Sequence, residues 1–275
     1  MRVAVIQYPG SNCEYETYWA LKFAGLDAEI FRWNKDPEEL KKFSAYVLSG
    51  GFSYQDRVRA GAIAAKKPIM KVIMEEAEKG KPVLGICNGA QILVESGMIP
   101  GIKWGEVEMA LAPNTGGGRA GYYCNWVFLK CEVEGSRCAI SAYFKKDEVI
   151  PMPVAHAEGR FTTRSEEVIK KLLSHNQIVF RYCTSHGEIR EEFPYNPNGS
   201  IFSIAGICNP QGNVVAMMPH PERATWIRQI PDDLDSPYSL KKYKGRGSIQ
   251  AMREPGPGYK IFLSLREYIK QLNLE

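Results

Sequence analysis

Short apolar runs alternate with amphipathic stretches through the first hundred residues. Period-two and continuous apolar patterns predict strands at residues 2–8, 27–33, 45–49 and 82–86. Helical periodicity predicts helices between them, at about residues 13–24, 68–79 and 88–96. Strands and helices that alternate in this way are typical of a parallel sheet with helices on both faces.

The second half of the chain is richer in strand pattern. Five strands are predicted, at residues 122–133, 148–155, 178–183, 200–208 and 213–218, with one helix at 165–174. They indicate a mixed or antiparallel extension of the sheet. Prolines and glycines then crowd residues 229–258, which predicts a long irregular loop, and residues 259–272 read as an amphipathic helix.

Length and composition agree with one α/β domain. The chain has 275 residues, of which 44% are hydrophobic and 24% are charged, so it can bury a sizeable core. We therefore expect a single domain over residues 1–275, with a mixed, mainly parallel sheet flanked by helices. An irregular insertion is expected at about 226–258, before the C-terminal helix at about 259–272.

Charge and cysteine usage exclude several classes of function. The formal net charge of +4 is too small to suggest a nucleic-acid or membrane partner. The N-terminus enters a strand directly, and no apolar run approaches the ~20 residues of a membrane span, so we expect a cytoplasmic protein. Seven cysteines without a secretory signal indicate free thiols. Three of them recur every seventh residue, but they lack close pairs and a nearby histidine, so no metal site is expected (Cys124, Cys131 and Cys138).

The strongest chemical signal lies at the end of the strand predicted at 82–86. Cys87 follows it, with Gly85 and Gly89 two residues to either side, before the predicted helix. This spacing is typical of a nucleophile elbow, because the tight strand-to-helix turn leaves no room for a Cβ at the glycines. The helix N-terminus also stabilises negative charge on the sulfur.

A second signal follows the strand predicted at 213–218. His220 comes directly after it, and Glu222 lies two residues further on. A thiol, an imidazole that takes its proton and a carboxylate that fixes the imidazole tautomer form a catalytic triad. A lone buried cysteine or histidine is more often a packing residue. The two together, each at the end of an apolar strand, favour catalysis by Cys87, His220 and Glu222.

These motifs resemble those of the class I (triad) glutamine amidotransferases, which hydrolyse glutamine for a synthetase partner. The resemblance rests on residues 85–91 with 220–222, and it covers residues 2 to about 225. Three further segments, at residues 5–14, 49–62 and 156–160, resemble the glutaminase subunits of phosphoribosylformylglycinamidine synthases. The resemblance implies a flavodoxin-like fold and a supply of ammonia for converting formylglycinamide ribotide to formylglycinamidine ribotide in purine biosynthesis.

The resemblance also suggests roles for other residues. The elbow supplies the backbone N–H of Asn88 as one oxyanion donor, and the family pattern places the second donor at Gly51. Gln91 lies one helical turn after Cys87, and its family counterpart helps to bind the substrate L-glutamine; a helix-surface glutamine is the alternative. Arg119 is a candidate for holding the amino-acid end of the substrate.

Several other residues keep open interpretations. Cys13 belongs to a family-like motif at a helix start, and we expect it to be structural. A second His-x-Glu pair, His156 and Glu158, is expected near the substrate pocket or the partner interface, or in a structural turn. Residues 57–67 suggest either an exposed docking segment or helix packing. The triple glycine at 116–118 lacks the Gly-Lys-Ser/Thr ending of a phosphate loop, which argues against nucleotide binding.

Chemistry favours a partner protein, because free ammonia at neutral pH is mostly protonated and a poor nucleophile. The resemblance identifies this partner as a large ATP-dependent synthetase subunit, with a small auxiliary subunit. ATP and magnesium are expected there, and no cofactor is expected in this chain. Two alternatives remain: another class I amidotransferase or related elbow-cysteine hydrolase, and a catalytically silent subunit that only completes the synthetase.

Overall fold

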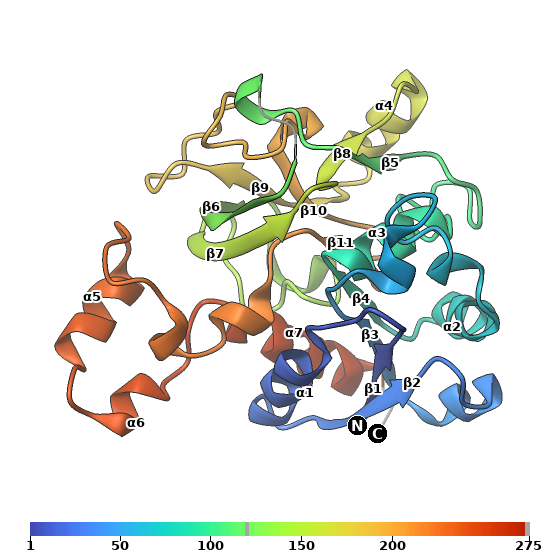
Figure 1. Cartoon of the computed structure of the whole chain (residues 1–275), viewed down its shortest axis with the longest axis horizontal. Helices are drawn as coiled ribbons and strands as arrows, with labels where there is room; N and C mark the ends of the chain where they lie inside the picture. Colours follow the sequence, from blue (N-terminus) through green and yellow to red (C-terminus); the bar gives the residue numbers. More distant parts are fainter. Residues whose placement is uncertain (119–120, 273–275) are drawn as a thin grey trace.

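A nine-stranded sheet forms the centre of the computed structural model, which describes residues 1–118 and 121–272 (Figure 1). Its strand order is β2-β1-β3-β4-β11-β10-β9-β6-β7. The first five strands pair in parallel: β2 (Asp27–Arg32), β1 (Arg2–Gln7), β3 (Ala45–Leu48), β4 (Val83–Ile86) and β11 (Val214–Met217). The others pair antiparallel: β10 (Ile204–Cys208), β9 (Ile178–Cys183), β6 (Tyr123–Cys131) and β7 (Val149–His156). The predicted mixed, mainly parallel sheet is confirmed.

Helices cover both faces of the parallel strands. Helices α1 (Glu14–Phe23) and α7 (Tyr259–Gln271) lie on one face, and α2 (Pro68–Glu78) and α3 (Asn88–Glu95) lie on the other (Figure 1). Strands such as β1 are therefore buried on both sides, and Val3, Ala4, Val5 and Ile6 have no exposed surface. Double burial explains why these strands read as continuous apolar runs in the sequence.

Smaller elements surround this core. Helix α4 (Glu166–Ser174) begins at Ser165, whose hydroxyl accepts a hydrogen bond from the Val168 N–H. Strands β5 (Ala110–Ala112) and β8 (Arg160–Thr162) form a separate two-stranded sheet that the sequence did not predict, because three-residue strands carry almost no periodic signal. Among the described residues, no helix is both long enough and apolar enough to span a bilayer.

Residues 226–258 differ from the irregular loop that the sequence predicted. They contain two helices, α5 (Pro237–Lys244) and α6 (Ile249–Met252), in an arm that stands out from the body of the molecule (Figure 1). Pro237 is at the first position of α5, where a missing N–H costs nothing, and Ser236 caps the helix. The proline that suggested a break is thus a helix start.

The sheet brings distant segments to one edge. The parallel register of β4 and β11 pairs Ile86 with Met217, so the residues that follow both strands emerge together. Strand β7 is at the far end of the strand order, yet its Pro153 carbonyl accepts a hydrogen bond from the His220 N–H at 2.8 Å. The antiparallel half therefore curls back over the carboxyl edge of the parallel half, where sites form in open α/β sheets.

Candidate active site

Cys87 occupies the turn between β4 and α3 in a strained backbone conformation. Its φ of 52° and ψ of −106° are unusual for a residue with a side chain. The flanking glycines permit this turn: a Cβ on Gly89 would lie 2.0 Å from the Leu48 carbonyl oxygen, and one on Gly85 would lie 2.6 Å from the Gly89 oxygen. The elbow geometry predicted from the glycine spacing is confirmed.

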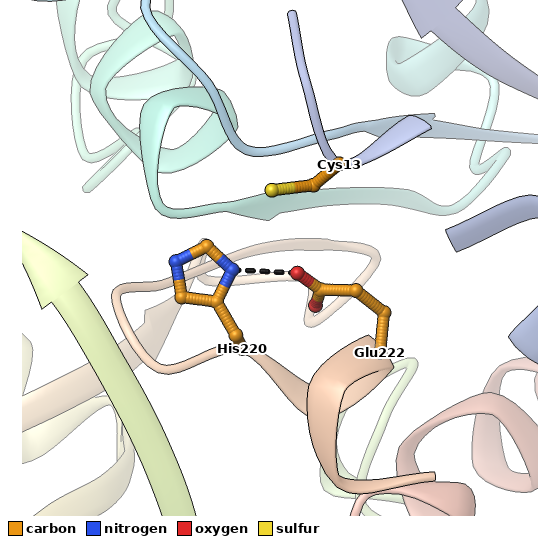
Figure 2. A group of neighbouring side chains, drawn as sticks. All are labelled: Cys13, His220 and Glu222. Atoms are coloured by element: carbon orange, nitrogen blue, oxygen red, sulfur yellow. Dashed lines mark hydrogen bonds and ion pairs between the residues drawn. The ribbon is translucent and has the colours of Figure 1, made fainter. Parts of the chain in front are cut away.

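His220 and Glu222 form a buried hydrogen-bonded pair after β11. The His220 Nδ1 atom lies 2.5 Å from Glu222 Oε1 (Figure 2). The carboxylate fixes the tautomer with the proton on Nδ1, which leaves Nε2 available to exchange a proton with a nucleophile. Nε2 makes no hydrogen bond to the described residues, a common state for a catalytic base before substrate binds.

Opposing effects act on the pKa of His220. Burial lowers this pKa, but the negative charge of Glu222 and that of a Cys87 thiolate, together with Cys13, raise it well above its ordinary value. The site therefore favours the imidazolium form of His220, which carries the proton that a departing amine requires.

The wall opposite the elbow is strand β7. The Ala155 carbonyl oxygen lies 3.5 Å from the Cys87 Sγ atom, and the Pro153 carbonyl holds the His220 backbone. One strand thus contacts the two segments that carry the proposed nucleophile and base.

The proposed oxyanion donors lie on two neighbouring turns. The Gly51 N–H donates no hydrogen bond to the described part of the chain, and Asn88 is the first residue of α3, where N–H groups have no intrahelical acceptor. Asn88 also ties the turns together, because its Oδ1 accepts a hydrogen bond from the Ser53 N–H at 3.0 Å. The geometry is compatible with an oxyanion hole, and this role stays a prediction.

Gln91 is buried rather than on the helix surface. Its Nε2 donates to the Glu158 carbonyl oxygen at 2.7 Å, and its Oε1 accepts from Asn88 Nδ2 at 2.9 Å. The side chain thus joins α3 to the 156–160 segment beside the elbow. Its predicted contact with substrate is untested.

The second His-x-Glu pair does not form a dyad. Neither ring nitrogen of His156 has a hydrogen-bond partner among the described residues, and the Glu158 carboxylate accepts instead from the Ala60 N–H at 3.3 Å. Burial, aided by the charge of His220, lowers the pKa of His156 to about 3. This histidine is a neutral packing residue beside the site, so the geometry favours His220 as the base.

The buried His156 predicts acid sensitivity. Above pH ~6.5 this imidazole is neutral in both the folded and the unfolded chain, so it does not make stability depend on pH. Between pH ~6.5 and its folded-state pKa of about 3, the unfolded chain binds a proton that the folded chain does not, and the folded chain loses stability as pH falls. Between pH 7 and 5 we expect wild type to lose about 2 kcal/mol relative to His156→Phe. Denaturant unfolding measures this, with His186→Gln as an exposed control. Parallel pH dependence of wild type and His156→Phe would contradict the assignment.

Sequence reasoning missed the position of Cys13 and Arg223. The Cys13 Sγ, a His220 ring nitrogen and a Glu222 carboxylate oxygen lie within 4.8 Å of one another, and Figure 2 shows the sulfur beside the imidazole. Arg223 Nη2 donates to this sulfur at 3.0 Å. The Gly-Ser-Asn-Cys sequence before α1 was the only signal, and it did not reveal the partner. Cys13 contacts the proposed catalytic group, beyond the purely structural role that we expected.

These three donors are a poor cation site. Burial raises the pKa of the Cys13 thiol, which opposes the deprotonation that a metal ligand requires. The Arg223 guanidinium adds a positive charge next to the sulfur. The arrangement favours a hydrogen-bonded network.

The remaining predicted residues lie as follows. Arg119 falls outside the described residues. Cys124 is exposed and Cys131 and Cys138 are buried; all seven cysteines are free, and the described residues show no metal-like grouping around these three. In the 57–67 segment, Arg57 to Arg59 are exposed, whereas Gly61 packs against α3, where a Cβ would lie 2.7 Å from the Gln91 carbonyl carbon. The segment therefore combines an exposed tip with packing on a helix.

Comparison with known proteins identifies the family of this chain. A family model for the CobB/CobQ-like glutamine amidotransferase domain matches residues 1–269. The phosphoribosylformylglycinamidine synthase subunit PurQ of Methanothrix thermoacetophila is 50% identical over 98% of this chain and 99% of its own length. The chain belongs to the PurQ family of glutamine amidotransferases.

Other PurQ relatives and a solved structure extend the match. PurQ of Methanopyrus kandleri is 46% identical, with 85% of this chain and 93% of that protein covered. A chain in the structure of PurLQS from Thermotoga maritima is 30% identical, has a TM-score of 0.70 and is matched over 98% of both chains. Membership in the PurQ family confirms the predicted glutamine amidotransferase and its fold class.

Proposed function

We propose that this chain is a glutaminase subunit that hydrolyses L-glutamine to glutamate and ammonia, with Cys87, His220 and Glu222 as its catalytic residues. The ammonia serves the ATP-dependent conversion of formylglycinamide ribotide to formylglycinamidine ribotide. The observation that carries the residue assignment is the 2.5 Å His220–Glu222 pair beside the strained elbow that presents Cys87.

Acylation begins with attack of the Cys87 thiolate on the side-chain amide carbon of glutamine. The carbonyl oxygen becomes an oxyanion, which the backbone N–H groups of Gly51 and Asn88 stabilise; each such donor typically contributes about 3 kcal/mol. The His220 imidazolium gives its proton to the amide nitrogen, the C–N bond breaks, and ammonia leaves. A glutamyl thioester on Cys87 remains, with His220 neutral.

Deacylation uses the same groups in reverse roles. Neutral His220 takes a proton from water, and the resulting hydroxide attacks the thioester carbon. The C–S bond breaks, glutamate leaves, and the thiolate and imidazolium are restored. Glu222 stabilises the imidazolium in both halves. Gln91 helps to bind the substrate in this proposal, and its hydrogen bond to the Glu158 carbonyl oxygen holds it beside the elbow.

The released ammonia is consumed by a partner protein in this proposal. One relative of known structure is a chain of PurLQS, and we propose that this chain likewise docks onto a large synthetase subunit, with a small auxiliary subunit. ATP and magnesium belong to that large subunit in this proposal. Docking shields ammonia from protonation on its way to the ribotide.

Glutamate release tests the proposed function. We expect the release to rise strongly when the synthetase subunits, ATP, magnesium and formylglycinamide ribotide are added to this chain and glutamine. Vigorous hydrolysis that ignores the partner would indicate a stand-alone amidohydrolase. No release under any condition would favour the silent-subunit alternative.

A further inference from the structure

Arg223 and His220 both lie near one oxygen atom of Glu222. Glu222 Oε1, which lies 2.5 Å from His220 Nδ1, also lies 4.0 Å from the Nε atom of Arg223. The carboxylate is fully buried, whereas the arginine side chain is 36% exposed. The partly solvent-screened guanidinium of Arg223 therefore lies next to the proposed His220–Glu222 pair.

Cys13 anchors this cation from the other side. Its sulfur accepts the hydrogen bond from Arg223 Nη2 and donates to Asn12 Oδ1 at 3.3 Å. The sulfur and the imidazole also share a packing surface: a Cβ on Gly50 would lie 3.1 Å from Cys13 Sγ and 2.8 Å from His220 Cε1. Arg223 thus lies against Cys13 and Glu222, and both of these residues also lie beside His220.

We propose that Arg223, held by Cys13 and Glu222, is a positioning residue that limits how strongly His220 retains its proton, and so sets the pH range of thioester hydrolysis. The inference rests on the proposed function. His220 must be protonated when ammonia leaves and neutral when water attacks. Glu222 alone favours the protonated form, and a nearby guanidinium opposes it.

The charged and titratable groups around His220 come from several elements. On its own segment are Glu222 and Arg223; from the facing elements come Cys13 before α1, Cys87 at the elbow, His156 on β7 and Tyr122 before β6. Arg223 is the strong cation among them, and it contacts Cys13 directly. Its removal therefore changes the charge balance without removing a group that touches the reacting atoms.

The test is the pH profile of kcat for glutamate release by the complete complex, at constant ionic strength. On the acid side of this profile (the acid limb), kcat rises with the fraction of His220 that is neutral, because deacylation needs the neutral imidazole. Loss of the Arg223 charge raises the pKa of this histidine, so Arg223→Gln should move the limb to higher pH by roughly half to one unit. On the acid side, kcat should fall about three- to tenfold and KM should fall with it, so that kcat/KM stays unchanged, because only deacylation slows.

Matched variants separate this role from a structural one. Arg223→Lys should restore most of the limb position. Arg228→Gln removes the same charge from an exposed arginine that lies over the Trp226 ring, and should not shift it. The proposal would be contradicted by an unmoved acid limb in Arg223→Gln, by a uniform loss of kcat at every pH, or by an equal shift in Arg228→Gln. Inactive wild-type complex would instead contradict the proposed function.

Discussion

Replacement of Cys87 by alanine is expected to lower glutamate release by about a thousandfold or more, because alanine cannot form the thioester and water must attack the amide directly. The side chain is small and buried, so the fold and the docking surface should survive. Glutamate release by the complex measures the loss. Ribotide amination with added ammonium salt at alkaline pH should continue, because ammonia then bypasses the glutaminase site.

Cys124→Ala is the matched control, because this cysteine is exposed and is not one of the proposed catalytic, oxyanion or substrate residues. It should leave glutamate release near the wild-type rate. Glutamine-dependent amination by a complex that carries Cys87→Ala would contradict the assignment of the nucleophile, since the ammonia would then come from another site.

The exchange of Glu222 for glutamine should lower kcat by about a thousandfold to ten-thousandfold. An amide presents either a neutral oxygen or an N–H group to His220 Nδ1, so it stabilises the imidazolium poorly and permits the wrong tautomer. Burial then lowers the pKa of His220 without the opposing carboxylate. Steady-state kinetics of glutamate release measures the effect.

Glu188→Gln is the control for this change, because Glu188 pairs with Arg190 at the surface. It should leave kcat unchanged. A Glu222→Gln enzyme with kcat within tenfold of wild type would show that the carboxylate does not orient the base. Glu158 or another group would then need to be considered for that role.

Local sequence rules were sufficient for the elbow and the parallel half of the sheet. A Cβ on Gly85 would lie 2.6 Å from the Gly89 oxygen, which is a contact within the turn itself, whereas the 2.0 Å contact of a Cβ on Gly89 is with the Leu48 oxygen on β3. Apolar runs encode the buried strands because both sheet faces are covered. His220 could be located because it follows an apolar run that forms β11, and this strand ends beside β4.

Local rules did not predict contacts between residues that are far apart in the sequence. Cys13 and Arg223 are 210 residues apart, and neither carries a periodic signal for the contact between them. The return of β7 to the site depends on the curl of the whole antiparallel half. In the 226–258 arm, proline and glycine density concealed two helices, because Pro237 and Gly245 mark helix ends as well as loops.

Peptide mass spectrometry of the glutamyl intermediate identifies the nucleophilic cysteine directly. The complete complex is mixed with glutamine, quenched in acid within the turnover time, digested and analysed for a glutamyl adduct on each cysteine-containing peptide. We expect an adduct on Cys87 that accumulates at low pH, where deacylation slows, and that is absent in Cys87→Ala. An adduct on Cys13, the other thiol beside His220, would contradict this assignment.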